Sequence, residues 1–350
     1  ESLPGKNWTT VVARTSKSPW LHNGYCEPGG FMPYKKAVCD YLRQYRGLRC
    51  EPEQVITTDG TQQALDLCAS VLFEKGDKVA VEDPYFQTHI NLLEFRGLKP
   101  IPIPVTQNGI DIEKLKKQKK IKGVLVTPCH QYPLGYVSSA ENNEKLLAWA
   151  KTEGAWIIED DYDSEFRFSG KPIPPIAGME GKRVIYMNTF TKTLSPTIRI
   201  SYMVLPVQLM QLFKEKLNFY ACTVSNFEQY TLAAFINKGY FEKHINRTRI
   251  LYRRQRDMFI DAINKSPLSS IITIHEENAG LHFLLHANTT LSDEKLIERA
   301  MQRGLKISCL SEYYADKSLA IDHTLVINYS ALSDDKINES IDKLYQCLTD

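Results

Sequence analysis

The 350-residue sequence lacks the hallmarks of a membrane protein and of a strongly charged nucleic-acid binder. Its apolar runs fall short of the roughly eighteen residues that cross a bilayer. Its 43 basic and 41 acidic side chains leave a formal charge of +2, so the net charge implies no general attraction to DNA or anionic lipid. It has no internal repeats and no low-complexity linkers. A chain of this length therefore predicts a large buried core, divided between two subdomains.

The cysteines include no Cys-x-x-Cys pair, which argues against a redox motif or a zinc ribbon. The eight are scattered, at Cys26, Cys39, Cys50, Cys68, Cys129, Cys222, Cys309 and Cys347. Such scatter is typical of reduced thiols that pack as small apolar side chains, and it predicts a cytoplasmic protein. Cys129-His130 offers two metal ligands, but without a second close pair we expect no metal site.

Strand-like apolar runs alternate with helical stretches as far as about residue 205. They lie at Lys78–Glu82, Leu98–Ile103, Gly123–Thr127, Ala155–Asp160, Arg183–Asn188 and Ile200–Leu205. Several are almost continuously apolar, as in strands covered on both faces. The alternation predicts an α/β fold with a doubly wound, mostly parallel sheet, which binds ligands at the carboxyl ends of its strands.

After Pro206 the pattern changes to a mainly helical stretch over 207–262, with a break near Asn237-Lys-Gly239. Strands are then expected at 270–286 and 322–330, and helices at 292–303 and 333–348. We divide the chain into an N-terminal segment (1–25) packing on the small domain or a partner subunit, a large α/β domain (26–205), a linking helical region (206–240) and a small α+β domain (241–350). The start, Glu1-Ser-Leu-Pro, has no signal peptide and no initiator methionine, which predicts a fragment of a longer chain.

Two of the predicted strand ends carry groups that suit one cofactor. Asp160 follows Ala155-Trp-Ile-Ile, and Lys192 follows the strand Arg183–Asn188, with Arg199 seven residues further on. A lysine that forms a Schiff base, an aspartate that keeps a pyridine nitrogen protonated and an arginine that reaches a phosphate together suit pyridoxal phosphate. The alternative for Lys192 is a solvated surface lysine, and the acids around Asp160 are alternative candidates or helix caps.

Two further segments offer contacts to a phosphate and to an aromatic ring. Gly60-Thr61-Gln62 begins a predicted amphipathic helix, whose first amides attract anions; the alternative is an ordinary N-cap by Asp59 or Thr61. Phe86, at another strand end, could stack on a ring or simply pack there. Tyr162 shares the face of Asp160 in an extended segment, so its hydroxyl could reach the ring oxygen.

These residues lie within strings that resemble the aminotransferase-like domain of the MocR group of bacterial transcription regulators, within the fold type I pyridoxal-phosphate proteins. The resemblance covers essentially the whole chain. Its strings are Tyr25-Cys-Glu-Pro-Gly-Gly30, Thr58-Asp-Gly-Thr-Gln-Gln-Ala-Leu-Asp-Leu67, Val126-Thr-Pro-Cys-His-Gln-Tyr-Pro-Leu-Gly135, Ile158-Glu-Asp-Asp-Tyr-Asp-Ser-Glu-Phe-Arg167, Thr189-Phe-Thr-Lys-Thr-Leu-Ser-Pro196 and Gly239-Tyr-Phe-Glu-Lys-His-Ile-Asn-Arg-Thr-Arg-Ile-Leu-Tyr-Arg-Arg254.

The resemblance implies a seven-stranded, mostly parallel sheet with a smaller C-terminal domain, and pyridoxal 5'-phosphate as the cofactor. It assigns the aldimine to Lys192, the pyridinium contact to Asp160, the ring oxygen to Tyr162 and ring stacking to Phe86. It assigns the phosphate to Thr61, Gln62, Thr189 and Arg199, beside Gly60. Tyr25 would reach the neighbouring subunit's phosphate in a homodimer. In the family, DNA binding belongs to a preceding winged helix-turn-helix domain, and this sequence contains nothing like it.

Three departures weaken the resemblance to a working aminotransferase. No arginine follows Arg303, although such enzymes usually hold the substrate carboxylate with a C-terminal arginine. The usual Asn-Pro-x-Gly string is Tyr132-Pro-Leu-Gly135, and Ser201 stands where glycine usually follows the phosphate arginine. Arg14, Arg46 or an arginine of the other subunit are the alternatives for holding a carboxylate.

The favoured interpretation is a regulator's sensor domain that binds pyridoxal phosphate and detects this cofactor, or an amino compound, through Lys192. An active aminotransferase and a scaffold without cofactor are the alternatives. The basic run Lys243–Arg256 places Arg249, Arg253 and Arg256 on one helical face. This face could contact DNA phosphates or dock the DNA-binding domain, but such runs are more often solvated and paired with acids.

Overall fold

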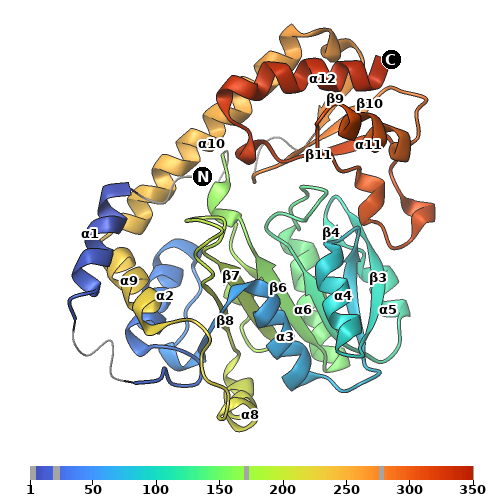
Figure 1. Cartoon of the computed structure of the whole chain (residues 1–350). Helices are drawn as coiled ribbons and strands as arrows, with labels where there is room; N and C mark the ends of the chain where they lie inside the picture. Colours follow the sequence, from blue (N-terminus) through green and yellow to red (C-terminus); the bar gives the residue numbers. More distant parts are fainter. Residues whose placement is uncertain (1–4, 19–23, 169–172, 276–279, 350) are drawn as a thin grey trace.

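An eight-stranded sheet forms the centre of the larger part of the molecule (Figure 1). The computed structural model describes residues 5–18, 24–168, 173–275 and 280–349, and none of the helices in these ranges is long and apolar enough to cross a membrane. The strands are β1 (Val55–Thr58), β2 (Lys78–Asp83), β3 (Lys99–Thr106), β4 (Gly109–Ile110), β5 (Ile121–Val126), β6 (Trp156–Asp161), β7 (Val184–Thr189) and β8 (Ser201–Val204).

The order of the strands is β1-β8-β7-β6-β5-β2-β3-β4, parallel from β7 through β3 and antiparallel at both ends. This confirms the predicted α/β fold class with a mostly parallel sheet. The described sheet has one strand more than the seven expected, and one of its strands, β4, is only two residues long. All six predicted strands are present, and β1 was not predicted because the sequence there was interpreted as a turn.

Helices cover both faces of the sheet because alternate strand residues point to opposite sides. Val124 and Ile157 pack into one apolar cluster, and their neighbours Leu125 and Ile158 pack into another. The helices of the sheet region are α2 (Met32–Tyr41), α3 (Gly60–Leu72), α4 (Gln87–Phe95), α5 (Ile112–Lys117), α6 (Ala140–Glu153), α7 (Ile176–Met179) and α8 (Val207–Leu217).

The helical region after Pro206 has two breaks rather than the single one predicted. The helices α8, α9 (Asn226–Asn237) and α10 (Tyr240–Lys265) are separated at 218–225 as well as at 238–239. Ser225 caps α9 by accepting a hydrogen bond from the Glu228 amide, which explains where α9 begins. The long helix α10 runs from the sheet region to the smaller domain, as Figure 1 shows.

The smaller domain is a three-stranded antiparallel sheet covered by helices. Its elements are β9 (Ile272–His275), β10 (Phe283–Ala287), α11 (Asp293–Gln302), β11 (Thr324–Ile327) and α12 (Ile337–Thr349). The single strand expected over 270–286 is therefore two strands, with 276–279 outside the described residues. The predicted α+β character of this domain agrees with the structure.

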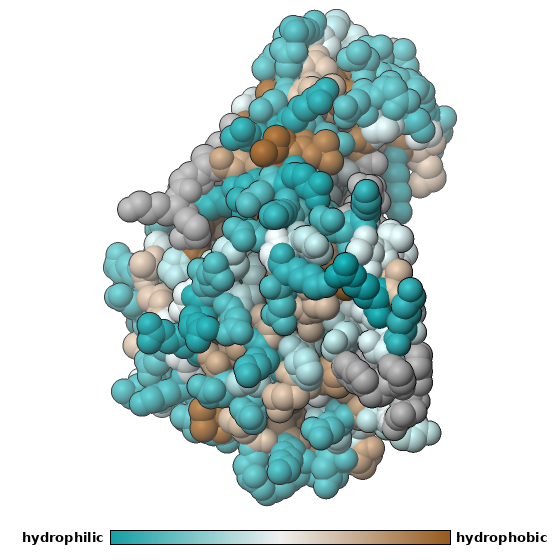
Figure 2. All heavy atoms as spheres, turned by 90° about the vertical axis from the view of Figure 1, so that its left-hand side faces the viewer, coloured by the Kyte–Doolittle hydropathy of each residue, from teal (hydrophilic) through white to brown (hydrophobic). Residues whose placement is uncertain are grey.

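The N-terminal helix α1 (Gly5–Thr15) packs on α9. Its Trp8 ring meets Phe235 edge-on, with ring centroids 5.3 Å apart. Figure 2 views the molecule from the side of α1, α9 and α10, and shows a mainly hydrophilic face with small, separate apolar groups. All eight cysteines are free thiols.

Candidate functional site

A cavity of about 440 Å³ lies where the carboxyl ends of the central strands face the smaller domain. Its size is in the range of small-molecule sites. It is lined by Thr61, Gln62, Tyr85, Phe86, His89, Thr127, Tyr132, Asp160, Tyr162, Asp163, Thr189, Thr191, Lys192, Arg199, Leu281, His282, Asn328 and Ser330. Eight of the ten predicted site residues are in this lining. The other two are Gly60, which contacts the lining residue Arg199, and Tyr25.

Asp160, the next-to-last residue of β6, has a buried carboxylate with an unpaired oxygen. Its side chain is 5% exposed, and its Oδ1 makes no hydrogen bond within the described structure. Burial raises the pKa of Asp160 to about 8, and the charge of the adjacent Asp161 adds to this shift. A protonated ring nitrogen would satisfy Oδ1 and offset the cost of burying a carboxylate, so the residue fits the predicted pyridinium contact.

His89 of α4 borders Asp160 without acting as its counter-ion. Its Nδ1 hydrogen bonds the Tyr85 hydroxyl at 3.1 Å and lies 4.0 Å from Asp160 Oδ2. Burial lowers the pKa of His89 to about 4, so the imidazole is neutral near pH 7. Asp160 therefore has no cationic partner among these residues.

Arg199 closes over the first turn of α3, where a phosphate was predicted to bind. Gly60 has φ +82°, and a Cβ at this position would lie 2.3 Å from Arg199 Nη2, so only glycine permits this approach. The Asp59 side chain does not cap the helix; its Oδ1 instead accepts a hydrogen bond from Arg199 Nε at 3.3 Å. The uncapped amides and the guanidinium together form a cradle suited to an anion.

Lys192 lies on the turn between β7 and β8, exposed to the cavity. The hydroxyls of this turn are linked: Ser201 Oγ donates to Thr189 Oγ1 at 2.7 Å, and Thr189 Oγ1 lies 2.9 Å from Thr191 Oγ1. Ser201, which stands where glycine is usual, is fully buried, and its hydrogen bond fixes the predicted phosphate ligand Thr189.

Phe86 and Tyr162 line the cavity from beyond the carboxyl ends of two parallel strands, β2 and β6. The Phe86 ring is 39% exposed and meets His89 edge-on, which leaves one face open for stacking. The Tyr162 hydroxyl lies 3.1 Å from His130 Nδ1, which in turn lies 2.9 Å from Asp163 Oδ2. A carboxylate only accepts, so His130 donates, and the Tyr162 proton is left for the cavity.

Tyr25 does not contribute to the cavity of its own chain. It is 98% exposed, in the segment before α2. The assignment of this side chain to a neighbouring subunit's phosphate stays a prediction.

Several lining residues were missed by the sequence reasoning. His282, Asn328 and Ser330 come from the smaller domain, more than 80 residues from Lys192 in the sequence. Their positions depend on how β10 and β11 pack against the sheet, which no local pattern reveals. A histidine inside the apolar run Leu281–Leu285 was the available signal.

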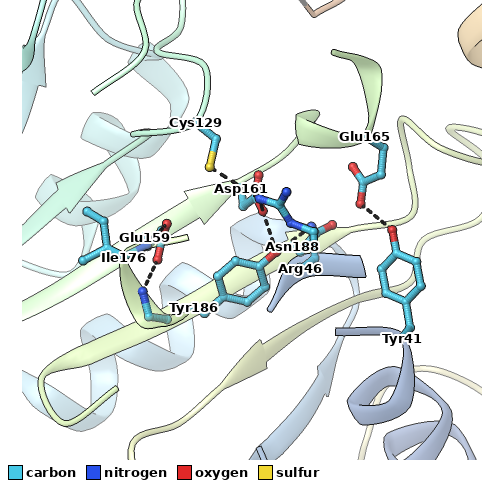
Figure 3. Close-up of polar contacts among 10 residues, drawn as sticks. Tyr41, Arg46, Cys129, Glu159, Asp161, Glu165, Ile176, Tyr186 and Asn188 are labelled. Carbon is cyan, nitrogen blue, oxygen red and sulfur yellow. Dashed lines mark hydrogen bonds and ion pairs between the residues drawn. The ribbon is translucent and has the colours of Figure 1, made fainter. Parts of the chain in front are cut away.

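A buried polar network around Asp161 is drawn in Figure 3. It lies on the face of β6 opposite Asp160, because successive strand residues point to opposite sides. Arg46, from a π-helical turn (Leu42–Arg46) after α2, donates from Nη2 to Asp161 Oδ2 at 2.7 Å, and the two side chains are only 4% and 1% exposed. The Tyr186 hydroxyl also donates to Asp161 Oδ2, at 2.5 Å, and Asn188 Nδ2 donates to that hydroxyl. This network fixes the strand end that carries Asp160.

Other buried acids hold the surrounding loops. Glu159 accepts from the Ile176 and Ala177 amides at 2.8 and 2.9 Å, and Tyr41 donates to Glu165 at 3.1 Å. Burial raises the pKa of Glu159 to about 8. The Glu159 contacts tie β6 to the start of α7, and the Tyr41–Glu165 bond ties the end of α2 to the turn after β6.

The network removes Arg46 from the candidates for holding a substrate carboxylate. Arg46 is committed to Asp161, and neither it nor Arg14 is among the residues that line the cavity. Within this lining, the basic side chains other than histidine are Lys192 and Arg199. The missing C-terminal arginine is therefore not replaced by another described lining residue.

Two arginines of the basic run on α10 contact other residues of the same chain. Arg249 Nε donates to the Glu165 carbonyl at 2.9 Å, and Arg256 donates to Asp257 and lies over the Phe168 ring at 4.9 Å. Two of the three arginines proposed to form a phosphate-binding face thus have internal partners, which favours a structural role for this run.

Comparison with known proteins agrees with this geometry. The aminotransferase class I and II profile matches residues 12–344. The chain is 39% identical over 316 residues to the uncharacterized HTH-type transcriptional regulator YdeL of Bacillus subtilis (strain 168), covering 90% of this chain and 67% of that protein. It is 35% identical over 348 residues to the probable rhizopine catabolism regulatory protein MocR of Rhizobium meliloti, covering 98% and 69%.

Among solved structures, Pyrococcus horikoshii kynurenine aminotransferase matches with a TM-score of 0.87 and 27% identity, over 99% of this chain and 87% of that one. The fold is thus that of the fold type I aminotransferases. The chain belongs to the aminotransferase class I and II family, and within it to the MocR-like transcriptional regulators. Pyridoxal phosphate is the cofactor of this family, which confirms the predicted cofactor. The orphan Oδ1 of Asp160 and the cradle at Gly60 fit it.

Proposed function

We propose that this chain is the effector-binding domain of a MocR-like DNA-binding regulator, which holds pyridoxal phosphate at Lys192 and detects this cofactor or a small amino compound. One observation carries the proposal: the cavity pairs a lysine with a buried, unpartnered aspartate oxygen, and the non-histidine cations of its described lining are Lys192 and Arg199, both assigned here to the cofactor. The names of the regulators to which the chain is similar support a regulatory role.

The chain's own residues have distinct tasks in this proposal. Lys192 would hold the cofactor covalently through its aldehyde carbon. Asp160 would keep the pyridine nitrogen protonated, and Arg199 with the first amides of α3 would bind the phosphate. The cofactor would supply an electron-accepting ring. Tyr162 would donate a hydrogen bond to the ring oxygen, and Phe86 would stack on the ring.

The test is the visible absorption spectrum of the purified domain after addition of pyridoxal phosphate. We expect a band from covalently bound cofactor that is lost in Lys192→Ala and retained in Lys214→Ala, a control at an exposed lysine of α8. An unchanged spectrum in Lys192→Ala would refute the assignment. If added amino acid bleaches the band and a keto acid restores it, the chain is an aminotransferase instead.

We also propose a cytoplasmic homodimer whose DNA contact is made by a winged helix-turn-helix domain that these 350 residues do not contain. Tyr25 and Phe219 are 98% and 81% exposed. Phe219 lies in the 218–225 segment, which contacts α3 where Thr223 Oγ1 donates to Gln63 at 3.0 Å. An exposed aromatic beside the phosphate cradle suits a subunit interface. Sedimentation equilibrium of the purified domain tests the dimer, and a monomer at micromolar concentration would refute it.

A further inference from the structure

The wall of the cavity opposite the phosphate cradle is aromatic and neutral. It is formed by Tyr132, from the loop after β5, and by Leu281, His282, Asn328 and Ser330 of the smaller domain. The Tyr132 ring meets His282 at 5.1 Å and 68° and Phe86 at 6.0 Å and 85°, so aromatic rings enclose this end. A ligand attached to or resting on the cofactor would project its free end toward this wall.

His282 presents a hydrogen-bond acceptor to this space rather than a positive charge. Its Nε2 lies 3.0 Å from the Pro133 carbonyl oxygen, which can only accept, so Nε2 carries the proton and Nδ1 has a free lone pair. Burial lowers the pKa of His282 to about 3, with the nearby His130 as a second cause. The imidazole is therefore neutral at physiological pH.

The Tyr132 hydroxyl of the wall is also uncharged and already partnered. Tyr132 Oη lies 3.1 Å from Tyr313 Oη and hydrogen bonds the Asn328 side chain. The two acids of the cavity lining, Asp160 and Asp163, offer no positive charge to an added carboxylate. Its two non-histidine cations, Lys192 and Arg199, are taken by the cofactor if the proposed function is correct.

We infer that the effector of this domain, beyond its cofactor, is a primary amine without a carboxylate, with an apolar or cationic free end. A carboxylate buried at this wall would lose its hydration without gaining a guanidinium, which is costly. An aromatic or ammonium end instead gains ring contacts, cation–π attraction and the His282 acceptor. The inference deepens the proposed function and rests on it, since that function assigns both cations to the cofactor.

The experiment titrates cofactor-loaded protein by calorimetry with matched ligands that differ only by the carboxylate. The pairs are phenethylamine and L-phenylalanine, tyramine and L-tyrosine, and cadaverine and L-lysine. We expect at least one amine to bind, at least tenfold more tightly than its amino acid, and no amino acid to bind more tightly than its amine. An amino acid that binds more tightly than its amine, or no measurable binding by any of the three amines, overturns the inference.

A substitution at the wall tests whether the missing cation is the reason for the preference for amines. Asn328 is exposed to the cavity, and Asn328→Arg places a guanidinium there. We expect this variant to gain at least tenfold in amino-acid affinity. His286→Arg, at an exposed position of β10 outside the lining, adds the same side chain and should leave the preference unchanged. An equal gain in both variants would overturn the inference. Failure of wild-type protein to form the cofactor band would instead refute the proposed function.

Discussion

Removing Arg46 should be among the most destabilising single changes in the sheet domain. The Arg46–Asp161 pair spans 2.7 Å with both side chains at most 4% exposed. Burial works against the arginine charge, but Asp161, together with the neighbouring Tyr186, Cys129 and Glu165, outweighs it and holds the pKa of Arg46 above its ordinary value. Arg46→Met leaves Asp161 with only the Tyr186 hydroxyl as a partner. Breaking a buried pair by removing one member costs about 3–5 kcal/mol, and we expect a loss in this range.

The assay is urea unfolding at pH 7, followed by circular dichroism, of the single variants Arg46→Met and Asp161→Asn and of the double variant. The double variant should be destabilised by about 2 kcal/mol less than the sum of the singles, because it leaves no unpaired charge. Arg43→Met is the matched control. Its ion pair with Asp40 has the same 2.7 Å separation but 65% and 55% exposed side chains, so its loss should cost at most about 1 kcal/mol.

The reasoning fails if Arg46→Met and Arg43→Met lose equal stability, since burial would then not decide the strength of the pair. It also fails if the two single losses simply add in the double variant. A second readout concerns the cofactor, because Asp161 is the last residue of β6 and directly follows Asp160. We expect Arg46→Met to bind pyridoxal phosphate more weakly even at temperatures where it remains folded.

Three further predictions concern the cradle, the aspartate and the basic run. Gly60→Ala should weaken cofactor binding at least tenfold in an absorbance titration, because its Cβ displaces Arg199; Gly154→Ala, with a similar φ of +68° but open space, should not. In cofactor-free protein, the folded state keeps a proton on Asp160 up to about pH 8, whereas the unfolded chain releases it from about pH 4. The free energy of unfolding in urea should therefore fall as pH rises from 4 toward 8, and it should fall less in Asp160→Asn. Arg249→Met should lower the melting temperature, since Arg249 has an internal partner. For the same reason the domain should not bind DNA in a salt-dependent way, even at low salt.

That the main candidate cofactor-binding residues share one cavity could be predicted because their positions follow from local patterns. Asp160 and Lys192 each come just after an apolar run, and parallel strands bring their carboxyl ends to one edge. The start of α3 was evident from a glycine before an amphipathic stretch. The short edge strand β1 was missed because four residues ending in two threonines resemble a turn.

The rest of the site depends on contacts between distant parts of the chain. Arg46 and Asp161 are 115 residues apart, and the sequence suggested Arg46 as a carboxylate ligand rather than as the partner of a buried acid. The neutral wall at His282 and Asn328 needs the smaller domain in place. Propensity and periodicity describe single elements, so they could not indicate which side chains of different domains would meet.

Helix α10 has a mechanical consequence for any signal that begins at the cofactor. It is a continuous rod of 26 residues, roughly 39 Å long. Near its start, His244 Nε2 lies 2.8 Å from the carbonyl of Thr193, the residue after Lys192, while Phe259 and Ile263 near its end belong to the core of the smaller domain. A tilt of about 3° at the lysine turn thus displaces the far end by roughly 2 Å. We therefore expect occupancy of the pocket to move a surface far from it through this helix.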